Sequence, residues 1–114
     1  MRVTTDLWVS ALVRRVFAST GFAAVIQRGA TEAGAVFVLT RDRFGEMSLF
    51  GPAPQTSYDE AKPDERLFGR LETTNEEAIN TRLEQERKFD PDIWVVEVEP
   101  GSVPIEELIE IRTS

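Results

Sequence analysis

The chain has 114 residues and a formal net charge of −7, which suits one domain that can bury its own hydrophobic core. The lack of cysteine and histidine in the sequence excludes disulfides, thiolate nucleophiles and the usual zinc sites, and it removes the commonest proton shuttle. No apolar run reaches the roughly 18 residues that a membrane span needs, and no signal-peptide pattern opens the sequence. We therefore expect a cytoplasmic protein that forms a single domain over residues 1–114, without a cofactor, a metal site or a membrane contact.

Charge is distributed unevenly along the sequence. Residues 1–58 hold six arginines and four acidic residues, a balance of +2, whereas residues 59–114 carry a net charge of −9. A negative field repels phosphate backbones over a Debye length of about 8 Å at physiological salt, so nucleic acid is not the expected partner. The positive balance of residues 1–58 is still compatible with a local basic patch in this half of the chain.

The first predicted helix covers residues 6–19. Thr4 can cap its N-terminus, and Gly21 follows its end. Between these limits the apolar residues cover far more of the helix surface than one core face requires: Leu7, Trp8, Val9, Ala11, Leu12, Val13, Val16 and Phe17. The helix is therefore predicted to run through the middle of the fold, or to meet a second subunit with one flank.

Two strands are predicted over residues 22–28 and 35–41, joined as a β-hairpin by the glycine-containing turn 29–34. The run AVFVL within the second strand is apolar at every position, which predicts a central strand covered on both faces. Shorter strands are predicted over residues 47–50 and 66–71. The first of these strands ends at a proline-containing segment. An exposed, acidic loop over residues 56–65 then leads to the second strand.

A second helix is predicted over residues 75–89, where Thr74 and Glu77 form a capping box and a thin apolar stripe places the helix on the surface. A half-buried strand follows over residues 93–98. Residues 99–114 form a tail with a short helix, which either completes the core or stays flexible and docks on a partner. The predicted fold is an α+β domain with an antiparallel sheet of four to five strands, an N-terminal helix and a second, surface helix.

Three segments of the sequence resemble a known bacterial family: LWVSALVRR near the start, RGATEAGAVFV in the middle and FDPDIWVVEVE near the end. Similar runs, including FDPDLWVVE, occur in a small family of bacterial proteins of about this length that is known only as a domain of unknown function. The resemblance spans most of residues 5–99. It implies a stand-alone cytoplasmic bacterial protein and brings no activity, cofactor or partner with it.

Eight residues are candidates for a binding site, and none is a candidate catalytic residue. They are Trp8, Arg14, Arg15, Arg28, Arg41, Arg43, Asp90 and Asp92. On the first helix, Arg15 falls between apolar residues, so we expect it to bind an anion or a partner, or to form a structural ion pair with Asp90 or Asp92.

The remaining arginines suggest a small basic patch. If the predicted hairpin forms, Arg28 comes close to Arg41 at one end of it, and Arg43 follows in the next turn. With Phe37 or Phe44 beside them, these arginines could contact phosphates while the ring stacks on a base. This pattern predicts RNA or a phosphate ligand as the alternative partner.

A third hypothesis is carboxylate chemistry. Asp90 and Asp92, or the acidic residues within 59–65, could hold Mg²⁺ or act as an acid and base pair. The simpler interpretation of Asp90 and Asp92 is a turn whose side chains accept bonds from nearby backbone N–H groups. Since the sequence shows no nucleophile and base pair, and the glycines of GATEAG match no nucleotide-binding fingerprint, an enzyme is not the leading hypothesis.

The sequence therefore favours a non-enzymatic protein-interaction or regulatory module. The wide apolar flank of the first helix and the acidic second half of the chain predict association with a second copy or with another protein. RNA or phosphate binding is the alternative, and a carboxylate-metal enzyme is the third hypothesis.

Overall fold

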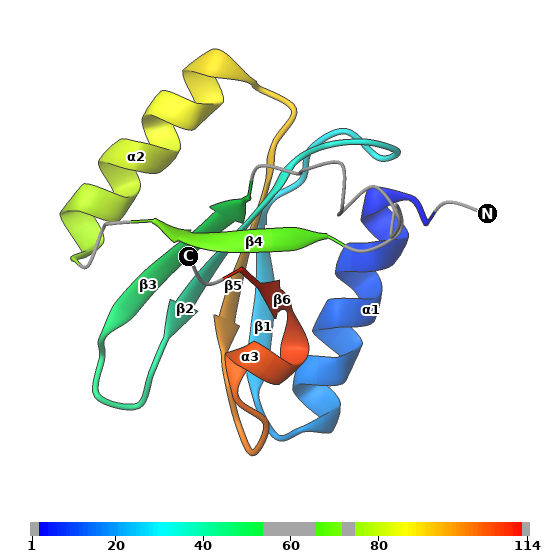
Figure 1. The fold of residues 1–114 in the computed structure, drawn as a ribbon, viewed down its shortest axis with the longest axis vertical. Helices are drawn as coiled ribbons and strands as arrows, with labels where there is room; N and C mark the ends of the chain where they lie inside the picture. The colour runs from blue at the N-terminus through cyan, green and yellow to red at the C-terminus, as the bar shows by residue number, and fades with distance from the viewer. Residues whose placement is uncertain (1–2, 54–65, 72–74, 113–114) are drawn as a thin grey trace.

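The computed structural model describes residues 3–53, 66–71 and 75–112 (Figure 1). In these ranges the elements are, in chain order, α1 (Thr5–Ala18), β1 (Phe22–Gln27), β2 (Val36–Arg41), β3 (Met47–Pro52), β4 (Leu67–Leu71), α2 (Glu76–Phe89), β5 (Trp94–Glu99), α3 (Ile105–Leu108) and β6 (Glu110–Ile111). Both long helices begin and end within one residue of the predicted limits. The loop predicted over 56–65 and the capping residue Thr74 lie outside the described residues, and the side chain of Asn75 caps α2 by accepting the N–H of Ala78 at 2.8 Å.

The six described strands form one mixed sheet in the order β1-β5-β2-β3-β4-β6. Strand β5 lies between β1 and β2, antiparallel to β1 and parallel to β2, with Val36 opposite Trp94. Strand β6 is parallel to β4. The α+β class is confirmed, but the predicted hairpin between residues 22–28 and 35–41 is wrong, and so is the antiparallel sheet of four to five strands.

The segment between β1 and β2 crosses the start of β5 instead of forming a hairpin turn. The Ala30 N–H donates to the Asp92 carbonyl at 3.0 Å, and the Trp94 indole N–H donates to the Ala30 carbonyl at 2.7 Å. A Cβ atom on Gly29 would lie 2.1 Å from the Asp92 oxygen, so this close approach requires glycine. The predicted turn is thus a loop that fits against β5, which is why β1 and β2 are not neighbours.

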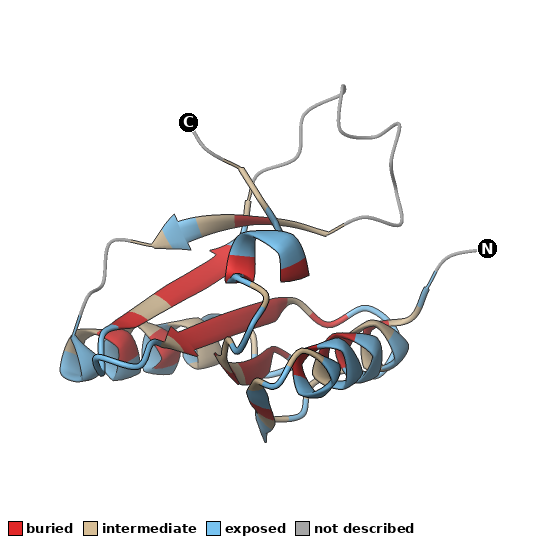
Figure 2. Cartoon of the chain, turned by 90° about the horizontal axis from the view of Figure 1, so that it is seen from below, coloured by how far each residue is buried: buried red, intermediate tan, exposed pale blue. Residues whose placement is uncertain are grey.

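Helices cover both faces of the sheet (Figure 2). On one face, α1 and α3 pack on a core made of Val9, Leu12, Val16, Ala23, Val36, Val38, Phe50, Phe68, Trp94, Val96, Val98, Ile105, Leu108 and Ile109. On the other face, α2 packs on a second core made of Phe37, Leu39, Met47, Leu49, Ile79, Leu83, Ile93 and Val95. Strand β2 contributes to both cores, which confirms the prediction from its continuous apolar run. Strand β5 was predicted to be half buried, yet Val95 is also fully buried.

Helix α1 uses only a narrow stripe for the core. Val9, Leu12 and Val16 are buried at spacings of three and four residues, whereas Leu7 is 61% exposed and Phe17 is 52% exposed. The helix therefore does not run through the middle of the fold: Leu7 and Phe17 point to the surface, and Trp8 and Val13 are only partly buried against the core.

The segment after Pro100 packs on the same core as α1. Ile105, Leu108 and Ile109 are buried in it, and the Arg15 guanidinium donates to the Leu108 carbonyl at 2.9 Å. Residues 105–111 therefore belong to the folded domain. None of the helices in the described ranges is both long and apolar enough to cross a membrane.

Candidate functional site

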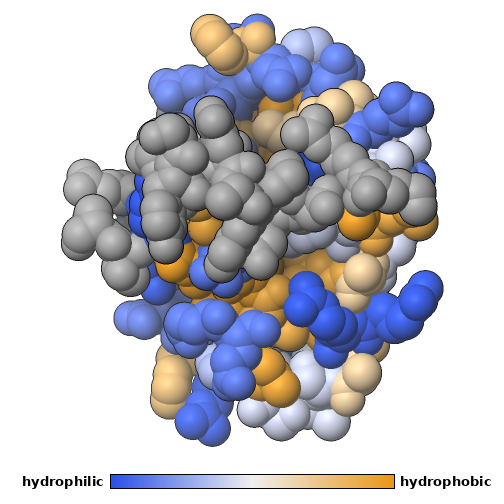
Figure 3. Space-filling model, turned by 45° about the vertical axis from the view of Figure 1, so that its right-hand side comes forward, coloured by the Kyte–Doolittle hydropathy of each residue, from blue (hydrophilic) through white to orange (hydrophobic). Residues whose placement is uncertain are grey.

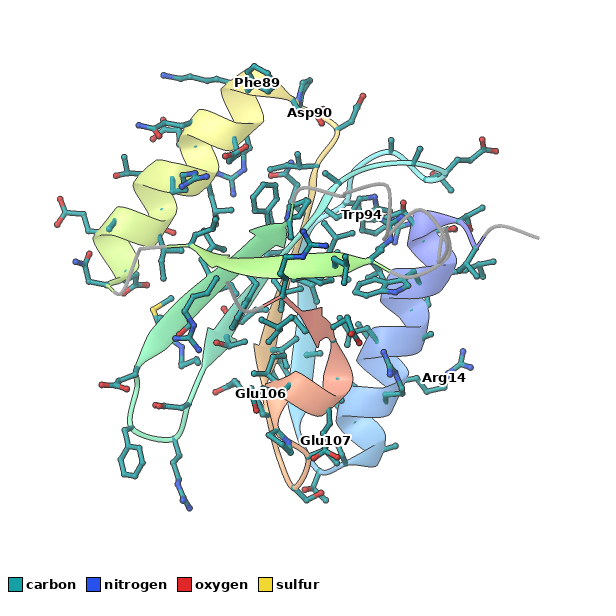
Figure 4. All side chains as sticks on the ribbon, in the orientation of Figure 1. Arg14, Phe89, Asp90, Trp94, Glu106 and Glu107 are labelled. Atoms are coloured by element: carbon teal, nitrogen blue, oxygen red, sulfur yellow. The ribbon has the colours of Figure 1, made fainter. Side chains whose placement is uncertain are left out.

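The candidate residues of the first helix lie on different surfaces. Trp8 is half buried, with its ring centroid 5.6 Å from that of Phe68 on β4, and the Arg66 guanidinium lies 5.7 Å from the Trp8 ring. Arg14 is exposed, and Figure 4 shows it on the outer side of α1. Arg15 donates to the Leu108 carbonyl, so its observed partner is a backbone oxygen of α3 and not Asp90 or Asp92.

The three other arginines do not form one patch. The guanidinium of Arg28 lies over the Trp94 ring at 4.8 Å, at the first residue of β5. Arg41 follows Thr40, which is opposite Val98 near the far end of β5. Five residues of strand, about 17 Å, separate these two levels of the sheet. Arg43 lies near the Phe44 ring in the β2–β3 turn, beyond Arg41. The predicted meeting of Arg28 and Arg41 is therefore wrong, because it depended on the hairpin.

The two aspartates of the FDPD segment shape a turn. The Asp90 carboxylate accepts the backbone N–H of Asp92 at 3.0 Å, and the Asp92 carbonyl accepts the N–H of Ala30. This is the simpler of the two interpretations made from the sequence. In the part of the chain that the structure describes, no three acidic side chains come close enough to hold a metal ion together. The acidic residues within 56–65 lie outside that part.

An apolar surface lies where α1 meets β1, and we call it the α1–β1 surface. It consists of the exposed side chains of Phe17, Phe22, Val25 and Ile26. The rings of Phe17 and Phe22 meet edge to face with centroids 5.8 Å apart, which joins the end of the helix to the start of the strand. β1 is one of the two edge strands of the sheet, so this surface adjoins backbone groups that no neighbouring described strand pairs. Figure 3 shows the side of the molecule that carries α1, where hydrophobic side chains gather beside hydrophilic ones.

The helical part of this surface follows from the sequence, whereas the strand does not. In the predicted hairpin the segment FAAVIQ has the next strand beside it and is not an open edge. An additional residue at Ile26 shifts the register between Val25 and Gln27, so a β-bulge terminates regular pairing there. The usable signal was the absence of charge in β1, which is unusual for an exposed edge strand.

A second feature missed from the sequence is a cavity of about 370 Å³ beside α3. It is lined by polar side chains of three neighbouring strands, Thr40, Ser48 and Arg70, which we call its floor, and by Glu46 and Glu106 from the β2–β3 turn and α3, which we call its margin. In β2, Thr40 follows Val38 on the face that α1 and α3 cover, so the polar residue marks where that cover ends. The change from an apolar to a polar residue on this face of β2 is the sequence signal that indicates the cavity.

The fold and these surfaces define a small α+β domain with a mixed, six-stranded sheet and two candidate surfaces for binding. The chain belongs to the DUF1491 family, described as a protein of unknown function, whose model matches residues 3–103. This confirms the family resemblance seen in the sequence. None of the curated proteins compared with the chain is similar to it.

Solved structures of similar proteins share the whole fold. A protein from A. tumefaciens, determined in solution, is 46% identical with a TM-score of 0.84, and the match covers 100% of this chain and 98% of that one. The crystal structure of a DUF1491 family protein from Caulobacter crescentus CB15 is 31% identical with a TM-score of 0.77, over 99% of this chain and 100% of that one. An NMR structure of a DUF1491 family protein from the same organism is 32% identical with a TM-score of 0.78, over 99% of both chains. These names assign no activity.

Proposed function

We propose that this protein is a non-enzymatic interaction module, and that it binds a second copy of itself through the α1–β1 surface. The observation that supports this most directly is the composition of β1, an edge strand of six residues without a charge, in which Phe22, Val25 and Ile26 are exposed. Soluble proteins usually protect such edges with charges or proline, because an open apolar edge pairs with other strands. An unprotected edge is therefore a candidate interface.

A two-fold axis would pair two copies of β1 in antiparallel orientation. Centred on Ala23, this pairing places Phe22 opposite Ala24 of the second copy, on the same face of the sheet, and leaves the bulge at Ile26 outside the ladder. The strand contributes no like-charge repulsion, and the ring of Phe17 extends the contact onto the helix. We favour a second copy over an extended peptide as the binding partner. In a symmetric dimer, the same α1–β1 surface on each chain forms the whole interface.

Net charge makes the proposed dimer sensitive to salt in a defined direction. Each chain carries a formal charge of −7, so two copies repel each other at low ionic strength. Added salt screens this repulsion and strengthens apolar contacts, so the dimer should become tighter. Binding to RNA or phosphate through arginines would weaken with salt instead.

The test is the mass in solution by light scattering over a range of protein concentrations. We expect twice 12.8 kDa for the natural chain, and 12.8 kDa for Phe22→Lys, which places a charge within the paired edges. Phe89→Lys is the matched control, since Phe89 is 91% exposed at the end of α2 and outside the α1–β1 surface; it should remain dimeric. A mass of 12.8 kDa for the natural chain at all concentrations would overturn the proposal.

The two other functions have less support. RNA or phosphate binding was predicted from arginines that lie at opposite ends of β5, and a metal-dependent enzyme was predicted in part from aspartates that form a turn. The cytoplasmic location is also part of the proposal, and it rests on the sequence.

A further inference from the structure

We propose that the cavity beside α3 binds a small α-amino acid with a cationic side chain. The cavity lies on β2, β3 and β4, whereas the α1–β1 surface is at the β1 edge of the sheet, beyond β5. The two proposals are therefore independent. Its volume of about 370 Å³ is in the lower part of the range of about 300–1,000 Å³ that is usual for ligand pockets.

The floor of the cavity presents groups that suit a carboxylate. Arg70 is exposed, donates to the Ser48 hydroxyl at 3.3 Å and lies over the Phe50 ring at 5.2 Å. These contacts hold the guanidinium in place without neutralising it, since no carboxylate of the described residues forms an ion pair with it. Thr40 is only 8% exposed, and its hydroxyl is 3.5 Å from the Ser48 carbonyl, a long contact that leaves it able to bond to a ligand.

The margin of the cavity presents groups that suit cations. Glu106 of α3 and Glu46 of the β2–β3 turn both line the cavity, and neither forms an ion pair with a described residue. Asp42 also lines it, and its Oδ1 accepts the N–H groups of Phe44 at 2.8 Å and Glu46 at 2.9 Å, which holds this carboxylate in the turn. Three carboxylates therefore oppose one guanidinium, and those of Glu46 and Glu106 are not held by the turn.

This balance of charges defines the class of ligand. A carboxylate on the ligand would pair with Arg70, and two cationic groups would pair with Glu46 and Glu106, which is the charge pattern of an α-amino acid with a basic side chain. Phosphate is disfavoured, because its greater negative charge would face the carboxylates at the margin. A divalent cation is disfavoured by the guanidinium on the floor.

The test is an amide ¹⁵N–¹H titration of the full chain with L-lysine. We expect saturable shifts at Thr40, Ser48 and Arg70, with a dissociation constant of about 1 mM or below. Cadaverine, which is lysine without its carboxylate, should bind about tenfold more weakly, and inorganic phosphate should not bind at this site.

Variants assign the two ends of the ligand. Arg70→Gln should remove the difference between lysine and cadaverine, and Glu106→Gln should weaken both about tenfold. Glu107→Gln is the matched control, because Glu107 is the neighbour on α3 and does not line this cavity; Figure 4 labels both side chains. The melting temperature of each variant verifies that it folds. The proposal is overturned if lysine gives no saturable shift up to about 10 mM, or if Glu106→Gln and Glu107→Gln bind it equally.

Discussion

The indole N–H of Trp94 donates a hydrogen bond of 2.7 Å to the carbonyl of Ala30, which ties the first residue of β5 to the loop between β1 and β2. Trp94 is also 1% exposed, and the Arg28 guanidinium covers its ring. One side chain therefore joins β5, the loop that crosses it and the core beneath α1. This contact helps to place β5 between two strands that precede it in the sequence.

Replacing Trp94 tests this role. Trp94→Phe should lower the free energy of unfolding by about 2 kcal/mol, because the Ala30 carbonyl loses the shorter of its two hydrogen bonds and keeps only that from the Gly34 N–H, and because the smaller ring leaves a cavity. Trp8→Phe is the control at the other tryptophan, which is only half buried, and it should cost about 1 kcal/mol or less. Urea unfolding followed by circular dichroism measures both. Equal losses of unfolding free energy in the two variants would show that the hydrogen bond from Trp94 to the Ala30 carbonyl contributes little.

The close approach at Gly29 predicts a steric effect. In Gly29→Ala the new Cβ atom would lie 2.1 Å from the Asp92 carbonyl oxygen, so backbone must move, and we expect a loss of at least about 3 kcal/mol in unfolding free energy. Gly69→Ala is the control in β4, where the nearest atom would be at 3.7 Å, an ordinary contact. Thermal unfolding compares the pair. A Gly29→Ala protein as stable as the Gly69→Ala protein would contradict the crossing of this loop over β5.

Two leucines of α1 differ in burial, because one lies in the core stripe of the helix and the other on its outer surface. Leu12 is 0% exposed and Leu7 is 61% exposed on the same helix. Leu12→Ala should cost about 3 kcal/mol through lost burial and a residual cavity, and Leu7→Ala should change the unfolding free energy by no more than about 0.5 kcal/mol. Chemical denaturation gives both values. A large loss for Leu7→Ala would mean that this flank is buried, for example in a dimer, and dilution would then reduce the loss.

Adjacent arginines test the attachment of α3. Arg15→Gln removes a donor to the Leu108 carbonyl and should lower the unfolding free energy by about 1 kcal/mol, because this bond is partly exposed to water. Arg14→Gln should change it by less than about 0.5 kcal/mol, since Arg14 is exposed on the outer side of α1. Hydrogen exchange provides the specific readout, with faster exchange in residues 105–109 for Arg15→Gln alone. Unchanged exchange there would disprove the attachment.

Local sequence patterns predicted the elements better than their arrangement. The helix limits and the double burial of β2 follow from residue spacing within one segment, and each was confirmed. The position of β5 depends on how Trp94 and Asp92 fit the loop at Gly29 and Ala30, which are distant in sequence. Strands that are adjacent in sequence are expected to pair, but β5 separates β1 from β2, and for this reason Arg28 and Arg41 do not meet.

The candidate sites were harder to predict for the same reason. The cavity combines Thr40, Ser48 and Arg70 from three strands with Glu106 from α3, and none of these residues stands out within its own segment. For the α1–β1 surface, the excess of apolar residues on α1 was visible in the sequence, but the exposure of β1 requires knowledge of the strand order. Patterns identify which side chains lack a local partner, and topology determines which of them meet.

The position of β5 also has a consequence for synthesis of the protein. A nascent chain that has passed β4 already contains β1 and β2, yet the strand that belongs between them has not been translated. Until β5 has left the ribosome as far as Glu99, β1 and β2 lack the strand that pairs with both of them. The sheet cannot form completely before that point. Folding of the sheet must therefore wait until β5 has been synthesised, and the apolar side chains of β1 and β2 remain accessible to molecular chaperones until then.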